Sequence, residues 1–462
     1  MTSIAGDRGI VKRAIGLVGL LLITLAVVWV GLRSIGSAPP PASLILITLD
    51  TTRADHLPPY EGGGLLPAVE RLAREGVVFD KAIASVPLTL PSHSSLFTGR
   101  NPPAHDVRVN ATVLAPGVPT LAESLRTAGY RTAAFVGSVV LDPDRGLARG
   151  FDVYHDVNGA PGQQGARRLR RPADEVIDDA LGWLPATNDA PFFMWVHLFD
   201  AHAPYAVPES SAAANGGGSY AGALAFMDSQ IGRLVAALES RGMFDRTAMI
   251  VTGDHGESLG EHGERGHGIF VYESALRVPL IVRWPGVAPR RVPQLVQLID
   301  VAPTVLALEG VTAPPMDGVD LVPVLRGRAT PERHGYAESM YPLQYGWSAL
   351  RTVRAGRFKL IEAPRAELYD LEADPHEQQN VFDAHQAEAQ RLLALLGTFG
   401  PADSRPDLPE RPEVRERLAA LGYVNPAGRP APAGPPSLWP DPKDMIDTYN
   451  TITEQRMRLH AR

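Results

Sequence analysis

The alternation of hydrophobic and polar positions along the chain predicts strands interleaved with helices. Four runs are mostly apolar: residues 44–49, 132–137, 191–197 and 247–252. Such runs are typical of parallel strands that are buried on both faces. Four stretches between these runs have the spacing of amphipathic helices: residues 67–76, 120–128, 173–184 and 220–242. The pattern predicts an α/β fold in which a large mixed, mainly parallel sheet is flanked by helices on both faces.

Beyond about residue 335 the pattern changes. Residues 351–357 and 358–362 predict a β-hairpin that turns at Ala355-Gly356, and a helix follows near residues 385–396. This region therefore predicts a small C-terminal antiparallel sheet with a helix. Pro-rich stretches after residue 400 indicate linkers. We divide the chain into four parts: residues 1–42, an N-terminal membrane anchor and linker; 43–333, a large catalytic domain; 334–400, an antiparallel subdomain; and 401–462, a Pro-rich tail with a terminal helix.

The N-terminal part is set apart by its hydropathy. Residues 14–32 carry no charge and are long enough to cross a bilayer. Basic residues precede the run and Arg33 follows it, so the positive-inside tendency places the N-terminus in the cytoplasm. We expect an uncleaved single-pass anchor in the cell membrane, with the catalytic domain periplasmic or extracellular. A cleaved signal peptide is the alternative.

Composition excludes several kinds of chemistry. The formal net charge is −7, so charge gives no support for a nucleic-acid partner. Cysteine is absent, which excludes disulfides, thiolate metal ligands and a cysteine nucleophile. Hydrophobic residues make up 45% of the chain and charged residues 21%, an ordinary globular balance. Any catalytic site must therefore work without a thiol group.

Candidate functional residues follow the predicted strands. Open α/β sheets carry their sites at the carboxyl ends of strands. Acidic and histidine residues occupy such positions, with one more histidine further along: Asp50, Asp200 and His202, Asp254 and His255, and His267. Taken singly, each has a structural alternative, such as a helix cap or a solvated polar loop. Their repetition at successive strand ends is what indicates a site.

Thr89 is the candidate nucleophile. Pro91 suits the first turn of a helix, and Gly99 suits the position just after a helix end. The Thr89 hydroxyl would then lie at a helix N-terminus, where free backbone amides favour an anion. Taken alone, a Thr-x-Pro sequence is also a common helix start.

Together these residues predict a metal-dependent nucleophilic site. Asp50, Asp254 and His255 would hold a divalent metal, with the Thr89 oxygen as a fourth ligand. A metal-bound hydroxyl ionises more readily than a free one, as a threonine nucleophile requires. We expect one ion, and leave open a second that Asp200 would help to hold. Because imidazole is a softer ligand than carboxylate, zinc or manganese is favoured over calcium.

Over roughly residues 43–400 the sequence resembles the sulfatase family of the alkaline-phosphatase superfamily. Six segments carry the resemblance, in the order expected of that family: residues 46–55, 91–100, 197–205, 252–257, 277–280 and 367–375. The resemblance implies the superfamily fold, a large mixed sheet flanked by helices with a small C-terminal antiparallel sheet. It also implies an enzyme acting on phosphoric or sulfuric esters.

Several positions depart from the sulfatase pattern. Sulfatases begin their Cys/Ser-x-Pro-x-Arg motif with the residue that becomes formylglycine. Thr89 stands at that position and His93 at the arginine position, and threonine cannot be converted to formylglycine. The Asp-Asp metal doublet is reduced to Asp50-Thr51, and His267 replaces a lysine that contacts sulfate. The resemblance therefore does not extend to the usual sulfatase nucleophile.

At these same positions the chain resembles lipid A phosphoethanolamine transferases, lipoteichoic acid synthases and nucleotide pyrophosphatases. The pyrophosphatases carry an Asn about twenty residues after the Thr that helps stabilise the transferred group, and Asn110 stands at a matching place. In the transferases, histidines that correspond to His202 and His267 contact phosphate or a second metal. The resemblance thus implies phosphoryl transfer through a covalent Thr89 intermediate.

The substrate class follows only in outline from this resemblance. It would be a phosphomonoester, a phosphodiester or a phosphoethanolamine-type ester, with a lipid headgroup or a glycan as its partner molecule. Hydrolysis and transfer both stay open. Sulfuric ester hydrolysis is one alternative function, and an inactive sulfatase-like binding or scaffold protein is another.

Overall fold

The central strand of the large sheet is β1, Ser43–Leu49, and it is buried along its whole length. It pairs in parallel with β5, Phe192–Leu198, on one side and with β6, Thr247–Gly253, on the other. Because every side chain of a central strand meets a covering layer, all three strands are apolar at almost every position. This explains the continuous hydrophobic runs of the sequence. The computed structural model describes residues 42–62, 66–159, 168–185, 190–208, 218–328, 331–400, 412–423 and 438–460.

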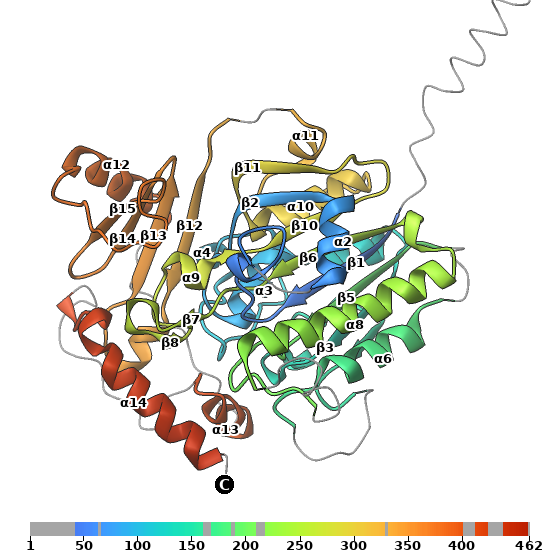
Figure 1. Cartoon of the computed structure of the whole chain (residues 1–462), viewed down its shortest axis with the longest axis horizontal. Coiled ribbons are helices and arrows are strands. Elements are labelled where there is room, and N and C mark those ends of the chain that lie inside the picture. The colour runs from blue at the N-terminus through green and yellow to red at the C-terminus, as the bar shows by residue number, and fades with distance from the viewer. Residues whose placement is uncertain are drawn as a thin grey trace, which may run out of the picture. The chain divides into compact units, whose positions relative to one another are not determined.

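The large sheet has nine strands in the order β11-β2-β10-β6-β1-β5-β3-β4, with β9 paired to β2 (Figure 1). The remaining strands are β2 Val77–Ile83, β3 Arg131–Val136, β4 Val153–His155, β9 Arg277–Val278, β10 Leu280–Arg283 and β11 Arg290–Gln297. Strand β10 runs antiparallel to both β6 and β2, whereas β3 is parallel to β5 and β4. The sheet is therefore mixed and mainly parallel, as predicted.

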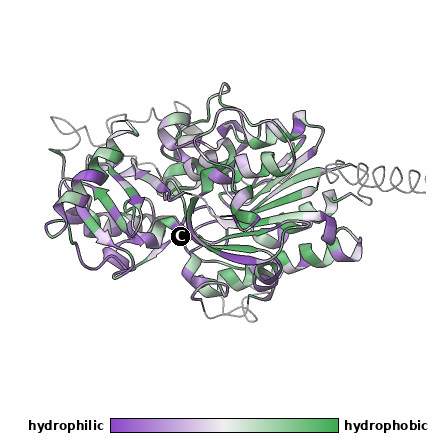
Figure 2. Ribbon diagram, turned by 90° about the horizontal axis from the view of Figure 1, so that it is seen from above, coloured by the Kyte–Doolittle hydropathy of each residue, from purple (hydrophilic) through white to green (hydrophobic). Residues whose placement is uncertain are grey.

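Helices cover both faces of this sheet, and the pleat of β1 divides the core between them. Leu44 and Leu46 join one hydrophobic cluster, while Ile45 and Ile47 join the other. The first cluster includes residues of α3 Thr89–Thr98, α5 Leu121–Thr127 and α10 Val301–Leu308. The second includes residues of α2 Pro67–Glu75, α6 Ala173–Trp183 and α8 Tyr220–Ser240. Figure 2 shows the hydrophobic strands between the two helical layers.

Local signals in the sequence account for several helix ends. Thr120 caps α5 by accepting a hydrogen bond from the Glu123 amide, and the Glu123 side chain accepts from the Thr120 amide in return. Gly99 ends α3 in a left-handed conformation with φ 63°, which favours glycine over other residues. Short helices α4 Pro102–His105, α9 Glu273–Leu276 and α11 Val322–Leu325 complete the large domain.

A smaller antiparallel sheet follows, formed by β12 His334–Ser339, β13 Leu350–Ala355, β14 Phe358–Glu362 and β15 Glu367–Asp370. The predicted hairpin is present, but it turns at Gly356 and Arg357, one residue later than the predicted Ala355-Gly356, because Ala355 still pairs with Phe358; α12 Gln386–Gly397 packs against the sheet. A buried ion pair between Arg108 and Glu338, with nitrogen and oxygen 2.6 Å apart, links β12 to the large domain. The predicted fold class is confirmed, whereas the four domain boundaries stay predictions.

Two helices, α13 Pro412–Ala420 and α14 Pro442–His460, lie in the C-terminal region (Figure 1). Leu418, Tyr423 and Tyr449 are buried and belong to the core cluster of the large domain. Helix α14 also contacts the hairpin formed by β7 Ser258–Leu259 and β8 Arg265–Gly266. The Asn450 side-chain amide donates a hydrogen bond over 2.7 Å to the carbonyl of Gly263, which lies between the two strands. The C-terminal region is therefore packed onto the large domain.

The predicted membrane location needs a correction. Within residues 42–460, as far as the structure describes them, no helix is long and apolar enough to cross a bilayer. The longest, α8, has 21 residues, but it buries one face on the sheet and carries charged residues such as Arg233 and Glu239 elsewhere. The predicted anchor, residues 14–32, lies outside the described residues. The prediction of a single-pass membrane protein with a periplasmic or extracellular domain is therefore withdrawn.

Candidate active site

The register of the central strands gathers the predicted residues at one edge of the sheet. Leu49 of β1 lies opposite Gly253 of β6 and Leu198 of β5. The residues that follow β1 and β6 are therefore neighbours: Asp50 on one side, and Asp254 with His255 on the other. This is the carboxyl edge at which open α/β sheets form their sites.

Asp50, Asp254 and His255 form a group that could hold a metal ion. Each offers one ligand atom, the three atoms lie within 4.8 Å of one another, and all three residues are buried. Two carboxylate oxygens, Asp50 Oδ1 and Asp254 Oδ2, lack a hydrogen-bond partner among the described residues. Buried carboxylate oxygens without partners are costly, so a cation is the group that suits them.

Hydrogen bonds orient two of these ligands. Asp254 Oδ1 accepts from the amides of Thr51, at 3.1 Å, and of His255, at 2.8 Å, which leaves Oδ2 for a cation. His255 Nδ1 donates to the Gly256 carbonyl over 2.9 Å, because a carbonyl oxygen can only accept. His255 Nε2 therefore faces the site, which is the orientation from which metal-ligating histidines bind.

Thr89 lies beside this group, in the first turn of α3. Its Oγ1 donates to Asp50 Oδ2 over 3.3 Å and lies 3.5 Å from His255 Nε2. All of Thr89, Asp50, Asp254 and His255 have 0% exposed surface. The hydroxyl is thus at the N-terminal end of a helix and in contact with the ligand group, as the sequence predicted. Its catalytic role stays a prediction.

Asn110 reaches the same helix end from the loop after α4. Its Oδ1 accepts a hydrogen bond from the Leu90 amide over 2.9 Å. Its Nδ2 is buried and lacks a partner among the described residues. Asn110 therefore fixes the start of α3 with one side of its amide and keeps a donor available with the other.

His202 and His267 lie on two loops and converge on one point. His202 Nδ1 donates to the Ala203 carbonyl over 2.8 Å, and His267 Nδ1 bonds Glu257 Oε2 over 2.7 Å. The ring centroids of the two histidines are 5.1 Å apart, and those of His255 and His267 are 4.5 Å apart. The Nε2 atoms of both residues contact the same hydroxyl, that of Tyr423.

Burial dominates the electrostatics of the site. It raises the pKa of Asp50 and of Asp254, with the neighbouring His255 acting in the opposite direction. Burial lowers the pKa of His202 to about 4 and places that of His267 well below its usual range, so both imidazoles are neutral. Neutral imidazoles can bind a cation. The buried carboxylates need a cation nearby to stabilise their negative charge.

Asp200, the candidate for a second metal site, lies apart from the ligand group. Its Oδ1 accepts from the Ala173 amide at the start of α6, over 3.3 Å, and burial raises its pKa to about 7. A second group within metal-binding distance, His93, His197 and Asp254, does not include it. Both nitrogens of His93 already have partners, the Thr89 carbonyl at 2.8 Å and the Thr48 hydroxyl at 3.0 Å. A second ion therefore has weaker support than the first.

Sequence reasoning missed three residues of the site. His197 Nε2 donates to Asp50 Oδ2 over 3.2 Å, Glu257 orients His267, and Tyr423 contacts both His202 and His267. The signal for His197 was a polar residue within an otherwise apolar strand. Glu257 comes two residues after the Asp254-His255 pair. Tyr423 had no local signal, because its position depends on packing across 221 residues of chain.

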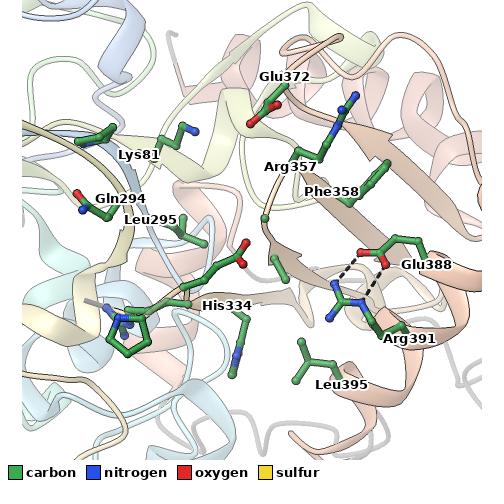
Figure 3. A pocket seen from close by; sticks show the side chains of 16 residues that line it. Lys81, Gln294, Leu295, His334, Arg357, Phe358, Glu372, Glu388, Arg391 and Leu395 are labelled. Atoms are coloured by element: carbon green, nitrogen blue, oxygen red, sulfur yellow. Dashed lines mark hydrogen bonds and ion pairs between the residues drawn. The ribbon is translucent and has the colours of Figure 1, made fainter. Parts of the chain in front are cut away.

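One large cavity lies elsewhere. It has a volume of about 920 Å³ and is lined by residues of β11, β14 and α12, among them Leu295, Phe358 and Leu395 (Figure 3). Its Arg391 pairs with Glu388 at 2.6 Å, and neither Thr89 nor the ligand group lines it. Figure 3 shows mixed charges on its wall. The candidate catalytic residues therefore lie at the sheet edge and not in this cavity.

Comparisons with known proteins agree with the fold. The profile of the sulfatase family matches residues 42–311, and one described as N-sulphoglucosamine sulphohydrolase, C-terminal, matches residues 260–396. Steryl-sulfatase of Mus musculus is 27% identical over 422 residues, 65% of this chain and 68% of that protein. Arylsulfatase A of Homo sapiens is 27% identical over 455 residues, 82% and 87% of the two chains.

Solved structures share the same architecture. Phosphonate monoester hydrolase of Agrobacterium radiobacter has a TM-score of 0.63 and 23% identity, and the match covers 78% of this chain and 96% of that one. The predicted resemblance to the sulfatase family is confirmed. Enzymes of that family depend on a metal, and this chain has a residue group that could hold one, while the binding of an ion and its identity stay predictions. Since the family profile spans more than half of the chain, the protein belongs to the sulfatase family and is an ester-bond hydrolase.

Proposed function

We propose that the protein cleaves phosphoric esters by transferring the phosphoryl-type group to Thr89. One observation carries the proposal: the residue beside the ligand group is a threonine, whose Oγ1 lies 3.3 Å from Asp50 Oδ2. Threonine cannot yield formylglycine, so a sulfatase nucleophile of the usual kind cannot form here. A threonine hydroxyl can act directly if its proton is removed.

The reaction would proceed in two steps. Thr89 Oγ1 attacks phosphorus and the bond from phosphorus to the ester oxygen breaks. The Thr89 proton passes to Asp50 Oδ2, to which it already donates, and from there to the ester oxygen, which leaves as an alcohol. Water, or a second alcohol, then attacks the phosphoryl-threonine and restores the Thr89 hydroxyl. The first acceptor makes the enzyme a hydrolase, and the second makes it a transferase.

The residues around Thr89 suit this chemistry. Asp50, Asp254 and His255 would hold a divalent ion, which would supply Lewis-acid stabilisation of the Thr89 oxygen and of the transferred group. Asn110 Nδ2 is a buried donor without a described partner. The Leu90 amide, next to Thr89, holds the Oδ1 of the same side chain, so Nδ2 would be available to stabilise the developing charge. His202 and His267 would contact the remaining oxygens of the group through Nε2. For His202 this requires uptake of a proton on Nε2, because its Nδ1 already donates to the Ala203 carbonyl.

Sulfuric ester hydrolysis is the second candidate function. It is favoured by the names of the relatives, a steryl-sulfatase and an arylsulfatase A. The phosphoryl proposal is supported instead by the threonine, and by a neighbour in fold that is named for hydrolysing phosphonate monoesters. Sulfate esters and glycans enter as substrate classes from relatives such as a hexuronate-2-O-sulfatase.

A panel of esters decides between these functions. Purified full-length protein is assayed on aryl phosphates, phosphodiesters, phosphonates and sulfates, each with zinc, manganese or calcium, while bound metal is measured in parallel. We expect the highest kcat/KM on a phosphorus ester with zinc or manganese. A preference for the aryl sulfate would replace the proposal by its alternative. Protein that binds no divalent ion and turns over no ester would support a scaffold role.

A further inference from the structure

The phenol of Tyr423 occupies the centre of the candidate site. Its hydroxyl lies 2.8 Å from His202 Nε2 and 3.2 Å from His267 Nε2. Tyr423 follows α13 and comes from the C-terminal region, far from the strands that build the site. One hydroxyl from a remote segment therefore contacts both candidate phosphate-binding histidines.

This position is the one an ester oxygen would need. A transferred group attacked by Thr89 must bring its oxygens to the groups around that hydroxyl, and His202 and His267 are the two imidazoles whose Nε2 atoms converge there. The Tyr423 side chain is itself 4% exposed, and Thr89 is fully buried. Substrate and the Tyr423 phenol therefore compete for one space.

Contacts of the same segment show how it is held. Arg417 pairs with Asp142 at 2.7 Å, and Leu418 is buried in the core of the large domain. The Tyr341 hydroxyl donates to the carbonyl of Gly422, directly before Tyr423. None of the described strands of the large sheet comes from residues 412–423. Displacement of the segment would therefore break no strand pairing of that sheet.

We propose that residues 412–423 form an intramolecular cap, in which the Tyr423 hydroxyl stands in for an oxygen of the tetrahedral anionic group and must leave before that group can bind. The inference rests on the proposed function, because it assigns the blocked space to the phosphoryl-type group. It identifies the ligand that competes with the cap as a tetrahedral oxyanion, of which inorganic phosphate is the simplest probe. Resting enzyme is then capped, and substrate binding opens it.

An alternative role for Tyr423 is that of a hydrogen-bond donor that stays in place during the reaction. The two roles predict opposite effects of Tyr423→Phe. Loss of a competing hydroxyl makes anion binding tighter, whereas loss of a catalytic donor lowers turnover and leaves the cap seated. Tyr130→Phe is a matched control, because the Tyr130 hydroxyl bonds Glu309, which belongs to no part of the site.

The test uses full-length, metal-loaded protein and hydrogen exchange of the peptides that span residues 416–423. We expect saturating inorganic phosphate to accelerate exchange there, and Tyr423→Phe to lower the phosphate dissociation constant about tenfold, as expected for removing one or two competing hydrogen bonds. Turnover of the best ester should rise in kcat/KM for Tyr423→Phe and stay unchanged for Tyr130→Phe.

Two results would overturn the cap. One is exchange over residues 416–423 that phosphate slows or leaves unaltered while phosphate binds. The other is a Tyr423→Phe variant with a lower kcat and an unaltered phosphate dissociation constant, which would make Tyr423 a catalytic donor. Exchange and phosphate binding need no turnover, so a protein inactive on every ester would refute the proposed function and still decide the cap.

Discussion

The Thr89 hydroxyl donates a hydrogen bond to Asp50 Oδ2 over 3.3 Å, although the two residues are 39 positions apart. Asp50 follows the central strand, and Thr89 opens a helix that packs on one face of the sheet. The same Asp50 oxygen accepts from His197 Nε2 over 3.2 Å, which leaves Oδ1 as the atom without a described partner. Asp50 thus links the candidate nucleophile to the candidate metal ligands. Changes at Thr89, at the metal ligands or at His197 should therefore affect the same site.

Removing the hydroxyl of Thr89 should abolish turnover while metal binding persists. Thr89→Ala is expected to lower kcat by about 10³-fold or more, because the covalent route is lost and the other ligands remain. Thr89→Ser keeps a hydroxyl and should retain measurable activity. Kinetics on the best phosphorus ester, with metal content measured on the same samples, check this. Full activity of Thr89→Ala with metal bound would refute the covalent mechanism.

Removal of the metal should cost both activity and stability. A chelator is expected to abolish turnover and to lower Tm, and readdition of zinc or manganese should restore both. A ligand at one hundred times its Kd stabilises the folded state by about 2.7 kcal/mol. Asp254→Asn should weaken metal binding because it removes the charge of Oδ2, the oxygen left without a partner.

Asp200→Asn is the matched control for the metal prediction. It is a buried carboxylate after a neighbouring strand, but it bonds the Ala173 amide and lies outside the ligand group. We expect its metal content to equal that of the unmodified protein. Loss of one equivalent of metal in this variant would instead place a second ion at Asp200.

His197 should act by positioning Asp50. Burial lowers its pKa to about 4, so it is a neutral donor to the Asp50 carboxylate at neutral pH. His197→Phe is expected to weaken metal affinity about 10- to 100-fold, the usual cost of losing a partner that orients a ligand. His105→Phe is the control, since this buried histidine bonds Ser95 and not the ligand group. Metal titrations check both, and equal affinities would contradict the prediction.

The fold and the ligand group could be predicted because their signals are local. A buried parallel strand has to be apolar at each position, so β1 and β6 stand out in the sequence, and the residues that follow them share one edge of the sheet. Thr89, Pro91 and Gly99 mark the start and end of α3 within eleven residues. Burial and backbone geometry restrict residue choice at such positions, and that restriction is visible in a single sequence.

The remaining site residues depend on tertiary packing. His197 lies in β5 next to Thr48 of β1, but no local rule distinguishes a buried structural histidine from one that orients a ligand. Tyr423 reaches His202 only because α13 and α14 fold back onto the large domain. From the sequence we predict a Pro-rich tail here. Composition alone does not distinguish a free tail from a segment that packs onto the domain.

A pH dependence of stability should arise at Asp228, which joins α8 to α2. Its two oxygens accept from the amides of Ala68, at 3.1 Å, and Val69, at 2.8 Å, at the start of α2. Burial nevertheless raises its pKa to about 6 from 3.8, with these amides acting in the opposite direction. The folded state therefore holds a proton between about pH 4 and pH 6 that the unfolded chain releases.

The sign of this effect follows from proton linkage. Because the folded state binds more protons in this window, the free energy of unfolding falls as the pH rises from 4 to 6, by at most about 3 kcal/mol. Asn at position 228 cannot titrate, so this contribution should vanish from the pH profile of stability of the Asp228→Asn variant. Loss of one hydrogen bond from a backbone amide should lower the stability of this variant by about 1 kcal/mol at pH 4. Urea denaturation of both proteins from pH 4 to pH 7 measures the difference, in which other carboxylates cancel. A difference that does not change with pH would show that Asp228 titrates equally in the folded and unfolded states.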